Sequence, residues 1–192
     1  DWDREEDRWL REVTLELEGT DGLERLARSR PEPSYLRAWC AAVETLGDWS
    51  ATFAACADAA HLAPTARSRA AFLDDAALAS IQLGMSAVPH RLELAWRASP
   101  TLTRLVRWLS SAPAASTMAE SVATATTACP ETAHRQRALL HLLRSEHRAV
   151  ASLLEEAAGL GWSRDEHPGH LAFPALLRAL GLAVEVQLPH EA

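Results

Sequence analysis

The chain has 192 residues, of which 48% are hydrophobic and 23% are charged, and its formal net charge is −7. This balance predicts a folded domain and argues against a disordered segment. The acidic excess leaves no basic surface to neutralise phosphates, so we expect neither nucleic acid nor an anionic membrane as a partner. All 19 basic residues are Arg, because Lys is absent, and Asn is absent too. Such a bias is typical of a GC-rich bacterial genome.

The cysteines and the apolar runs indicate the cellular compartment of the chain. Cys40, Cys56 and Cys129 form no CxxC pair and are odd in number, which argues against a disulfide framework or a zinc ribbon. No apolar run approaches the roughly 20 residues of a membrane span, and no apolar leader follows the acidic start. We therefore expect a cytoplasmic chain. Because it begins at Asp1, we also expect one domain of a larger protein.

The first helix is predicted over about residues 3–18. Its apolar side chains recur at helical spacing on one face: Trp2, Trp9, Leu10, Val13 and Leu17. The acidic cluster at its start suits the positive end of a helix dipole, and an acidic docking surface is the alternative. The stretch Gly19 to Gly22 predicts a break before a short helix, Leu23 to Ser29, which two prolines end.

Residues 33–64 predict a pair of antiparallel helices. Ser34 is expected to cap the first, and Gly47 provides the backbone freedom that a sharp turn requires. Asp48 is expected to cap the second helix, which stops before Pro64. These signals make this the best-formed pair of the chain.

Residues 65–100 predict a second pair, with a helix from Ala66 to Leu83 and another that Pro89 enters at its first turn. Pro100 ends it. The turn glycines of the two pairs, and likewise the closing prolines, recur at nearly the same interval, which is typical of stacked helix-hairpin repeats.

Residues 101–130 and 131–158 predict two more pairs with weaker turn signals. The Ser-, Thr- and Ala-rich stretch Ser116 to Ala128 is either a linker or a helix, and the spacing of Met118, Val122 and Ala125 favours a helix. The turn of the last pair is expected at Ser145. Residues 159–192 predict a loop, a closing helix from about residue 173, and a tail. Over residues 182–189 the tail alternates in hydropathy, and a helical end, a packed coil and an extended edge are all compatible with it.

Gly47-Asp48-Trp49, Ala59 and Pro64 resemble a tetratricopeptide repeat, which places Gly and an aromatic residue at the inter-helix turn, a small residue at the helix crossing and Pro at the end. The second pair keeps Gly84 and Pro100. The predicted fold is therefore all-α, a right-handed stack of antiparallel helix pairs (a tetratricopeptide-like superhelix) with about ten to twelve helices, in a single domain over residues 1–192.

The resemblance implies a binding groove, since such arrays bind peptides or proteins on the concave wall formed by the first helix of each pair. The matching positions are Ser34, Arg37, Ala41, Glu44 and Thr45 in one helix, and Ala71, Asp74, Leu78 and Gln82 in the next. The alternative is that these are merely exposed or partly packed helix positions. The Lys, Asn and Arg clamp that some members use for a terminal carboxylate is not expected, because Lys and Asn are absent. The mixed charges favour a polar or partly basic ligand.

The side chains with potential for metal binding or catalysis are histidines and cysteines. His134 and His141 lie two turns apart, too far to share a metal ion. The loop His167-Pro168-Gly169-His170 holds potential metal ligands closer together in the sequence. Such loop histidines are nevertheless more often capping or solvent-facing groups. Cys40 and Cys56 fall on apolar helix faces, and no phosphate-binding loop occurs. We expect no metal, no cofactor and no enzyme; an enzyme centred on the His167–His170 loop is the third hypothesis.

The chain contains seven tryptophans. Trp39, Trp49 and Trp96 fall on predicted buried stripes, whereas Trp108 and Trp162 are predicted contact anchors. The resulting hypothesis is a non-enzymatic protein- or peptide-binding scaffold or regulatory module. The alternative is a small-molecule sensor with a pocket between helices, and the oligomeric state stays open.

Overall fold

The computed structural model describes residues 5–156 and residue 181. Over these residues the chain is all-helical, which confirms the all-α part of the predicted fold. The helices that it describes are α1 (Glu5–Ser29), α2 (Pro33–Glu44), α3 (Trp49–Leu62), α4 (Ala66–Gln82), α5 (Val88–Ala98), α6 (Leu102–Ser110), α7 (Ala115–Ala128), α8 (His134–Leu143) and α9 (His147–Glu156). The expected total of ten to twelve helices and the superhelix stay predictions.

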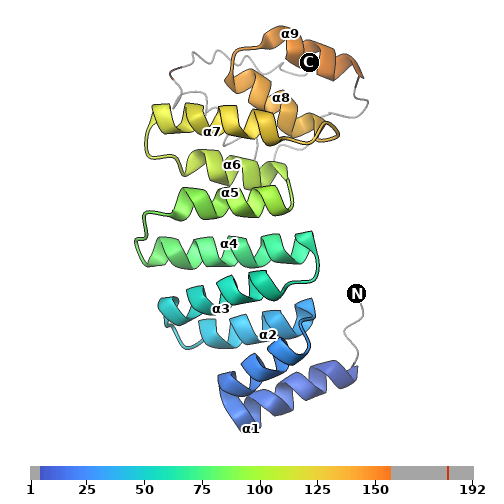
Figure 1. Ribbon diagram of the computed structural model, residues 1–192, viewed down its shortest axis with the longest axis vertical. Helices are drawn as coiled ribbons and strands as arrows, with labels where there is room; N and C mark the ends of the chain where they lie inside the picture. The colour runs from blue at the N-terminus through green and yellow to red at the C-terminus, as the bar shows by residue number, and fades with distance from the viewer. Residues whose placement is uncertain (1–4, 157–180, 182–192) are drawn as a thin grey trace, which may run out of the picture. The chain divides into compact units, whose positions relative to one another are not determined.

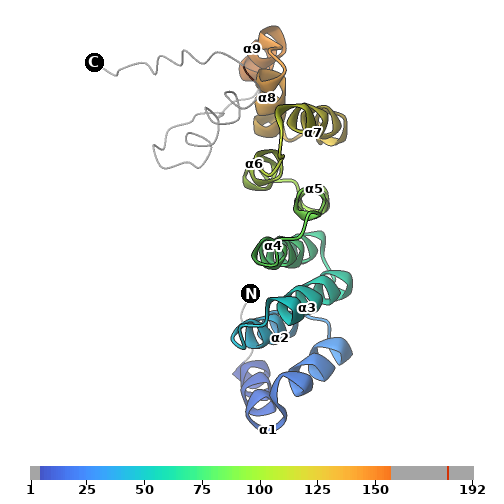
Figure 2. The ribbon, with the colours of Figure 1, turned by 90° about the vertical axis from the view of Figure 1, so that its left-hand side faces the viewer.

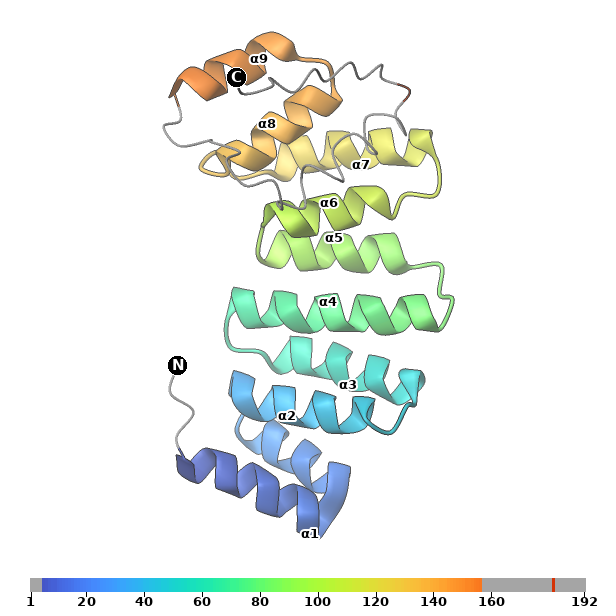
Figure 3. The same ribbon diagram turned by 180° about the vertical axis from the view of Figure 1, so that it is seen from behind.

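The helices divide into two compact units, Asp1–Ser99 and Pro100–Ala192. In the first unit each helix packs on the next one along the chain, so that α1 to α5 form a row (Figure 1). The α2–α3 and α4–α5 turns lie on one side of this row and the α3–α4 connection on the other (Figure 3). In the second unit α6 packs on α7 and α8, α7 on α8, and α8 on α9.

The turn between α2 and α3 has the predicted chemistry. Gly47 has a φ of 74°, a left-handed conformation in which any Cβ is strained. Asp48 caps α3, because its carboxylate accepts hydrogen bonds from the backbone N–H groups of Ser50 at 2.9 Å and Ala51 at 3.1 Å. The expectation that Ser34 caps α2 is wrong: the helix already begins at Pro33, whose fixed φ suits the first turn, so Ser34 lies inside the helix.

In the second helix pair, the helices also begin and end close to the positions that the sequence predicts. Thr65 and Ser68 form a reciprocal capping box at the start of α4, which the sequence analysis did not anticipate. The helix ends at Gln82, and Gly84 follows with a φ of 64°. Pro89 lies in the first turn of α5, as predicted.

The core of the first unit combines large and very small side chains. Trp39, Phe72 and Trp96 are almost fully buried, and Ala59 and Ala77 have no exposed surface. Alanine at such positions lets helix backbones approach closely, while each large apolar side chain contributes about 1.5–3 kcal/mol by leaving water. Trp39, Ala59 and Phe72 belong to one buried cluster that joins α2, α3 and α4 around the pocket described below.

The N-terminal helix agrees with its prediction in one way and differs in another. The break expected from Gly19 is present as a kink, because Gly19 leaves the helical region (φ 67°, ψ −157°), but it is shorter than predicted, since the helix resumes directly after Gly19 (Figure 2). The apolar face of its first half is exposed and does not contribute to the core: Trp9 is 59% and Leu17 79% exposed. Trp2 lies outside the described residues.

Helices α6 and α7 correct one prediction and confirm another. Trp108 is only 2% exposed, so its assignment as a contact anchor is wrong. It lies three residues after Leu105 and next to Leu109, and all three are buried on one wide apolar face. The stretch rich in Ser, Thr and Ala is helical as α7, with Met118 and Val122 buried.

The last described pair turns at Ser145, as predicted, with a φ of 59°. Across this turn His141 Nδ1 and Glu146 Oε2 lie 2.6 Å apart. The predictions for Trp162, the His167–His170 loop, the closing helix and the tail over residues 182–189 lie outside the described residues.

Candidate functional site

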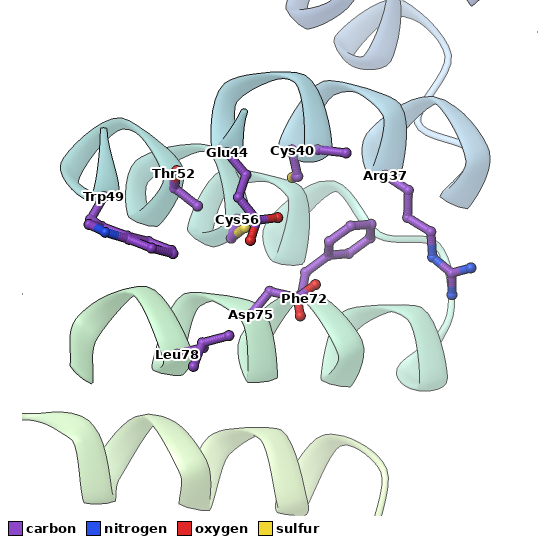
Figure 4. Close-up of a pocket in the computed structure, with 10 residues that line it drawn as sticks. Arg37, Cys40, Glu44, Trp49, Thr52, Cys56, Phe72, Asp75 and Leu78 are labelled. Carbon is purple, nitrogen blue, oxygen red and sulfur yellow. The ribbon is translucent and has the colours of Figure 1, made fainter. Parts of the chain in front are cut away.

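A pocket of about 260 Å³ lies between α2, α3 and α4 in the first unit. Four of the predicted groove residues contribute to its wall: Arg37, Ala41, Glu44 and Leu78. The full lining adds one further residue from α2, three from α3 and two from α4: Cys40, Trp49, Thr52, Cys56, Phe72 and Asp75 (Figure 4). We call this feature the α2–α4 pocket.

Helical spacing explains why each helix contributes its particular set. The lining residues of α2 stand at i, i+3, i+4 and i+7, and those of α4 at i, i+3 and i+6, so each set shares one face. On α3 the lining residues run from Trp49 to Cys56 at the same kind of spacing. The Asp48 cap and the Gly47 turn determine where α3 begins, and hence which of its residues face the pocket.

The pocket has a buried floor and an exposed rim. Cys56, Phe72 and Thr52 are at most 4% exposed and form the floor. Leu78 is 50% exposed at the rim, and Arg37 is exposed as well. In Figure 4 the Trp49 ring and Leu78 lie at one end and Arg37 at the other. The wall therefore offers an apolar end and a guanidinium end.

Two carboxylates lie between these ends. Glu44 on α2 and Asp75 on α4 project toward the middle of the pocket from facing helices (Figure 4). With Arg37, the lining holds two acidic groups and one basic group. An excess of negative charge across facing walls favours a cationic group of a ligand.

The two cysteines that line the pocket, Cys40 and Cys56, are unreactive. A hydrogen bond with Cys56 raises the pKa of the Cys40 thiol, and burial and the charge of Asp75 raise it further. Because the thiolate is the nucleophilic form, a thiol with a raised pKa reacts slowly. Both cysteines are free and buried, so they pack as small apolar groups, in agreement with the interpretation from the sequence.

The remaining predicted groove residues do not line the pocket. Thr45 is exposed just after α2, and its hydroxyl donates to the carbonyl of Ala42 in that helix at 2.7 Å. Gln82 is exposed, while Asp74 is half-buried. Ser34 and Ala71 are half-buried too.

Asp75 takes the place that the resemblance assigned to Asp74. It lies three residues after Phe72 and three before Leu78, and this spacing alone places the three on one face. The signal was therefore present in the sequence. The pairing of Cys40 with Cys56 had no such signal, because it depends on how α2 packs against α3.

Among the described residues, no group of three or more His, Cys, Asp or Glu is arranged to hold a metal ion. The same part of the chain contains no helix whose length and apolar character would let it span a bilayer. Comparison of the chain with protein family models, curated proteins and solved structures finds no match. The tetratricopeptide resemblance thus depends on the residues quoted for it.

Proposed function

We propose that the chain is a non-enzymatic module that binds a segment of a protein or peptide along α2 and α4. The observation that carries the proposal is the α2–α4 pocket, in which residues from the first helices of two successive pairs meet over a buried floor. In a tetratricopeptide-like array these first helices would form the concave wall. The cytoplasmic location and a partner other than nucleic acid belong to the same proposal. The free cysteines support the location, and the net charge of −7 supports the partner.

The size of the pocket favours a side chain as its occupant. Sites for small molecules typically enclose about 300–1,000 Å³, and this pocket encloses about 260 Å³. The sensor hypothesis needs a larger, more closed cavity. A single long side chain fits the available volume, with the rest of the segment lying on the exposed rim.

The charges of the pocket favour an Arg or Lys side chain. A cation between Glu44 and Asp75 would be attracted by both carboxylates, and the Trp49 ring offers a face to it or to its stem. The exposed Leu78 would contact an apolar neighbour in the same segment. We therefore expect ligands that contain a basic residue beside an apolar one.

A peptide array probed with the whole 192-residue chain tests the proposal. Hits should be enriched in Arg or Lys next to an apolar residue, and Leu78→Asp should weaken their binding by more than tenfold. Glu44→Gln should weaken it about two- to fivefold, as expected for an exposed ion pair. Leu94→Asp is the matched control, because Leu94 is 40% exposed on α5 and does not line the pocket. Binding that Leu78→Asp and Leu94→Asp affect equally would contradict the assignment of the pocket.

A further inference from the structure

The first half of α1 exposes its apolar side. Trp9, Val13 and Leu17 follow one another at intervals of four residues, and they are 59%, 43% and 79% exposed. Leu10 lies beside them and is 37% exposed. These four residues, which we call the α1 stripe, share one side of the helix. Contiguous exposed apolar surfaces are typical of interaction sites.

The opposite side of this half-helix is mostly polar, with Leu15 at its edge, and its polar residues are held against α2. Asp7, Arg11 and Thr14 are half-buried. Asp7 Oδ1 accepts a hydrogen bond of 2.5 Å from the buried Tyr35 hydroxyl, and the Arg11 guanidinium lies 5.5 Å from the centre of the Tyr35 ring. These contacts orient the helix with its polar side inward, so the α1 stripe points away from α2.

The position of α1 agrees with this orientation. It lies at the end of the row formed by α1 to α5, with α2 as its neighbour within the row (Figure 1). The α1 stripe extends about 12 Å along the helix, since residues 9 and 17 are separated by eight steps of about 1.5 Å. This length matches two to three turns of a partner helix.

The charges beside the α1 stripe define the partner. Glu5, Glu12 and Glu16 follow one edge of it, each three or four residues from Trp9 or Val13. Residues 5–18 contain six carboxylates and two arginines, and the pair Arg8–Glu12 is exposed, with Nε and Oε1 3.7 Å apart. A second copy of the chain would bring two acidic edges together, and such like-charge contacts disfavour it.

We infer that the α1 stripe binds an amphipathic helix of another protein, one that carries Arg or Lys along an edge of its own apolar stripe. Apolar burial supplies most of the affinity, and the acidic edge selects the partner and its orientation. This surface is separate from the α2–α4 pocket, and its function does not depend on that of the pocket.

The test uses the whole chain and two fluorescently labelled helical peptides of about 20 residues, long enough to form a helix on binding. The peptides share one apolar stripe and differ only at its edge, which carries Arg in one and Glu in the other. Fluorescence anisotropy should show binding of the Arg peptide at least tenfold tighter than that of the Glu peptide. The preference should shrink as salt is raised.

Matched variants assign the binding to the α1 stripe. Val13→Asp should weaken binding of the Arg peptide by more than tenfold, whereas Leu15→Asp should leave it unchanged. Leu15 is 42% exposed, nearly the same as Val13, but it lies two residues away and so on almost the opposite side of the helix. The double variant Glu12→Arg, Glu16→Arg changes only exposed positions and should shift the preference to the Glu peptide. Leu78→Asp, in the α2–α4 pocket, should have no effect.

Several results would overturn the inference: no binding of either peptide, equal binding of both, or equal effects of Val13→Asp and Leu15→Asp. Sedimentation of the chain alone tests whether a second copy of the chain occupies the α1 stripe. A dimer that Val13→Asp dissociates would assign the α1 stripe to self-association and would likewise overturn it.

Discussion

Gly84 and Ser145 occupy equivalent positions in two helix-to-helix turns. Their φ angles are 64° and 59°. The N–H of Gly84 donates to the carbonyl of Ile81 at 3.0 Å, and the N–H of Ser145 to that of Leu142 at 2.9 Å. The next N–H group in each turn reaches a carbonyl five residues back, from Met85 to Ser80 and from Glu146 to His141. The same turn is thus made once with the residue that suits it and once with a residue that is strained there.

Ser145→Gly should therefore stabilise the second unit by about 1 kcal/mol, because a side chain in the left-handed region costs about that much. Gly84→Ala should destabilise the first unit by a similar amount. No atom lies within 4 Å of a Cβ built on Gly84, so its cost is conformational and not steric. Urea unfolding measures both changes. Ser111→Gly is the control, since Ser111 has a φ of −82° and should gain nothing; an equal gain there would contradict the argument.

Trp108→Ala should destabilise the second unit by about 3–5 kcal/mol, the usual cost of removing a buried Trp side chain. The side chain is 2% exposed and lies on the same buried face of α6 as Leu105 and Leu109. Trp9→Ala provides the comparison, because Trp9 is 59% exposed, and its effect should stay within about 0.5 kcal/mol. Thermal and urea unfolding distinguish the two. A small effect at Trp108 would return it to the role of a surface contact.

The turn at Ser145 should make the second unit sensitive to acid. The hydrogen bond with His141 lowers the pKa of Glu146 below its ordinary value of 4.5, and the charge of Arg144 lowers it further. A carboxylate with a lowered folded-state pKa stabilises the fold above the unfolded-state pKa, and this contribution is lost as the pH falls through the folded-state value. The stability difference between the wild type and Glu146→Gln should therefore shrink between about pH 5 and pH 2. A difference that stays constant over this range would contradict the assignment.

The thiol of Cys40 should resist alkylation in the folded protein. Its pKa is raised by the hydrogen bond with Cys56 and by burial, and each unit of pKa lowers the thiolate fraction roughly tenfold. Mass spectrometry after treatment with iodoacetamide should show labelling at Cys40 more than tenfold slower in the native protein than in urea. Cys129 serves as the internal comparison. Burial raises the pKa of its thiol too, but Cys129 is only half-buried and should label faster than Cys40. Native labelling of Cys40 as fast as that of Cys129 would mean that the α2–α4 pocket opens around Cys40.

Local chemistry made many element boundaries predictable. Asp48, Gly47, Gly84 and Pro89 act on backbone groups within a few residues of themselves, so their effects do not depend on the rest of the fold. Periodicity is similarly local, and it correctly identified α7 as a helix. The candidate site was predictable to the extent that it follows from one helix face, as Arg37, Ala41 and Glu44 do on α2.

The predictions that differ from the structure share a different cause. Periodicity states which residues share a face of a helix, but not whether another element covers that face. Trp108 is covered although it was expected to be exposed, and the α1 stripe is exposed because Tyr35 holds the polar side of the helix inward. The proximity of Asp75 to Glu44 and the contact of Cys40 with Cys56 likewise require three helices to meet.

By itself, then, the amino-acid sequence determined the all-helical class, the turns and the residues that each helix places on one side, because these depend on backbone geometry over one or two turns. The tertiary structure decided which of those sides is buried, which lines the α2–α4 pocket and which stays open as the α1 stripe. Those outcomes depend on packing between residues distant in sequence, where the loss of exposed apolar surface and the pairing of polar groups compete over the whole unit.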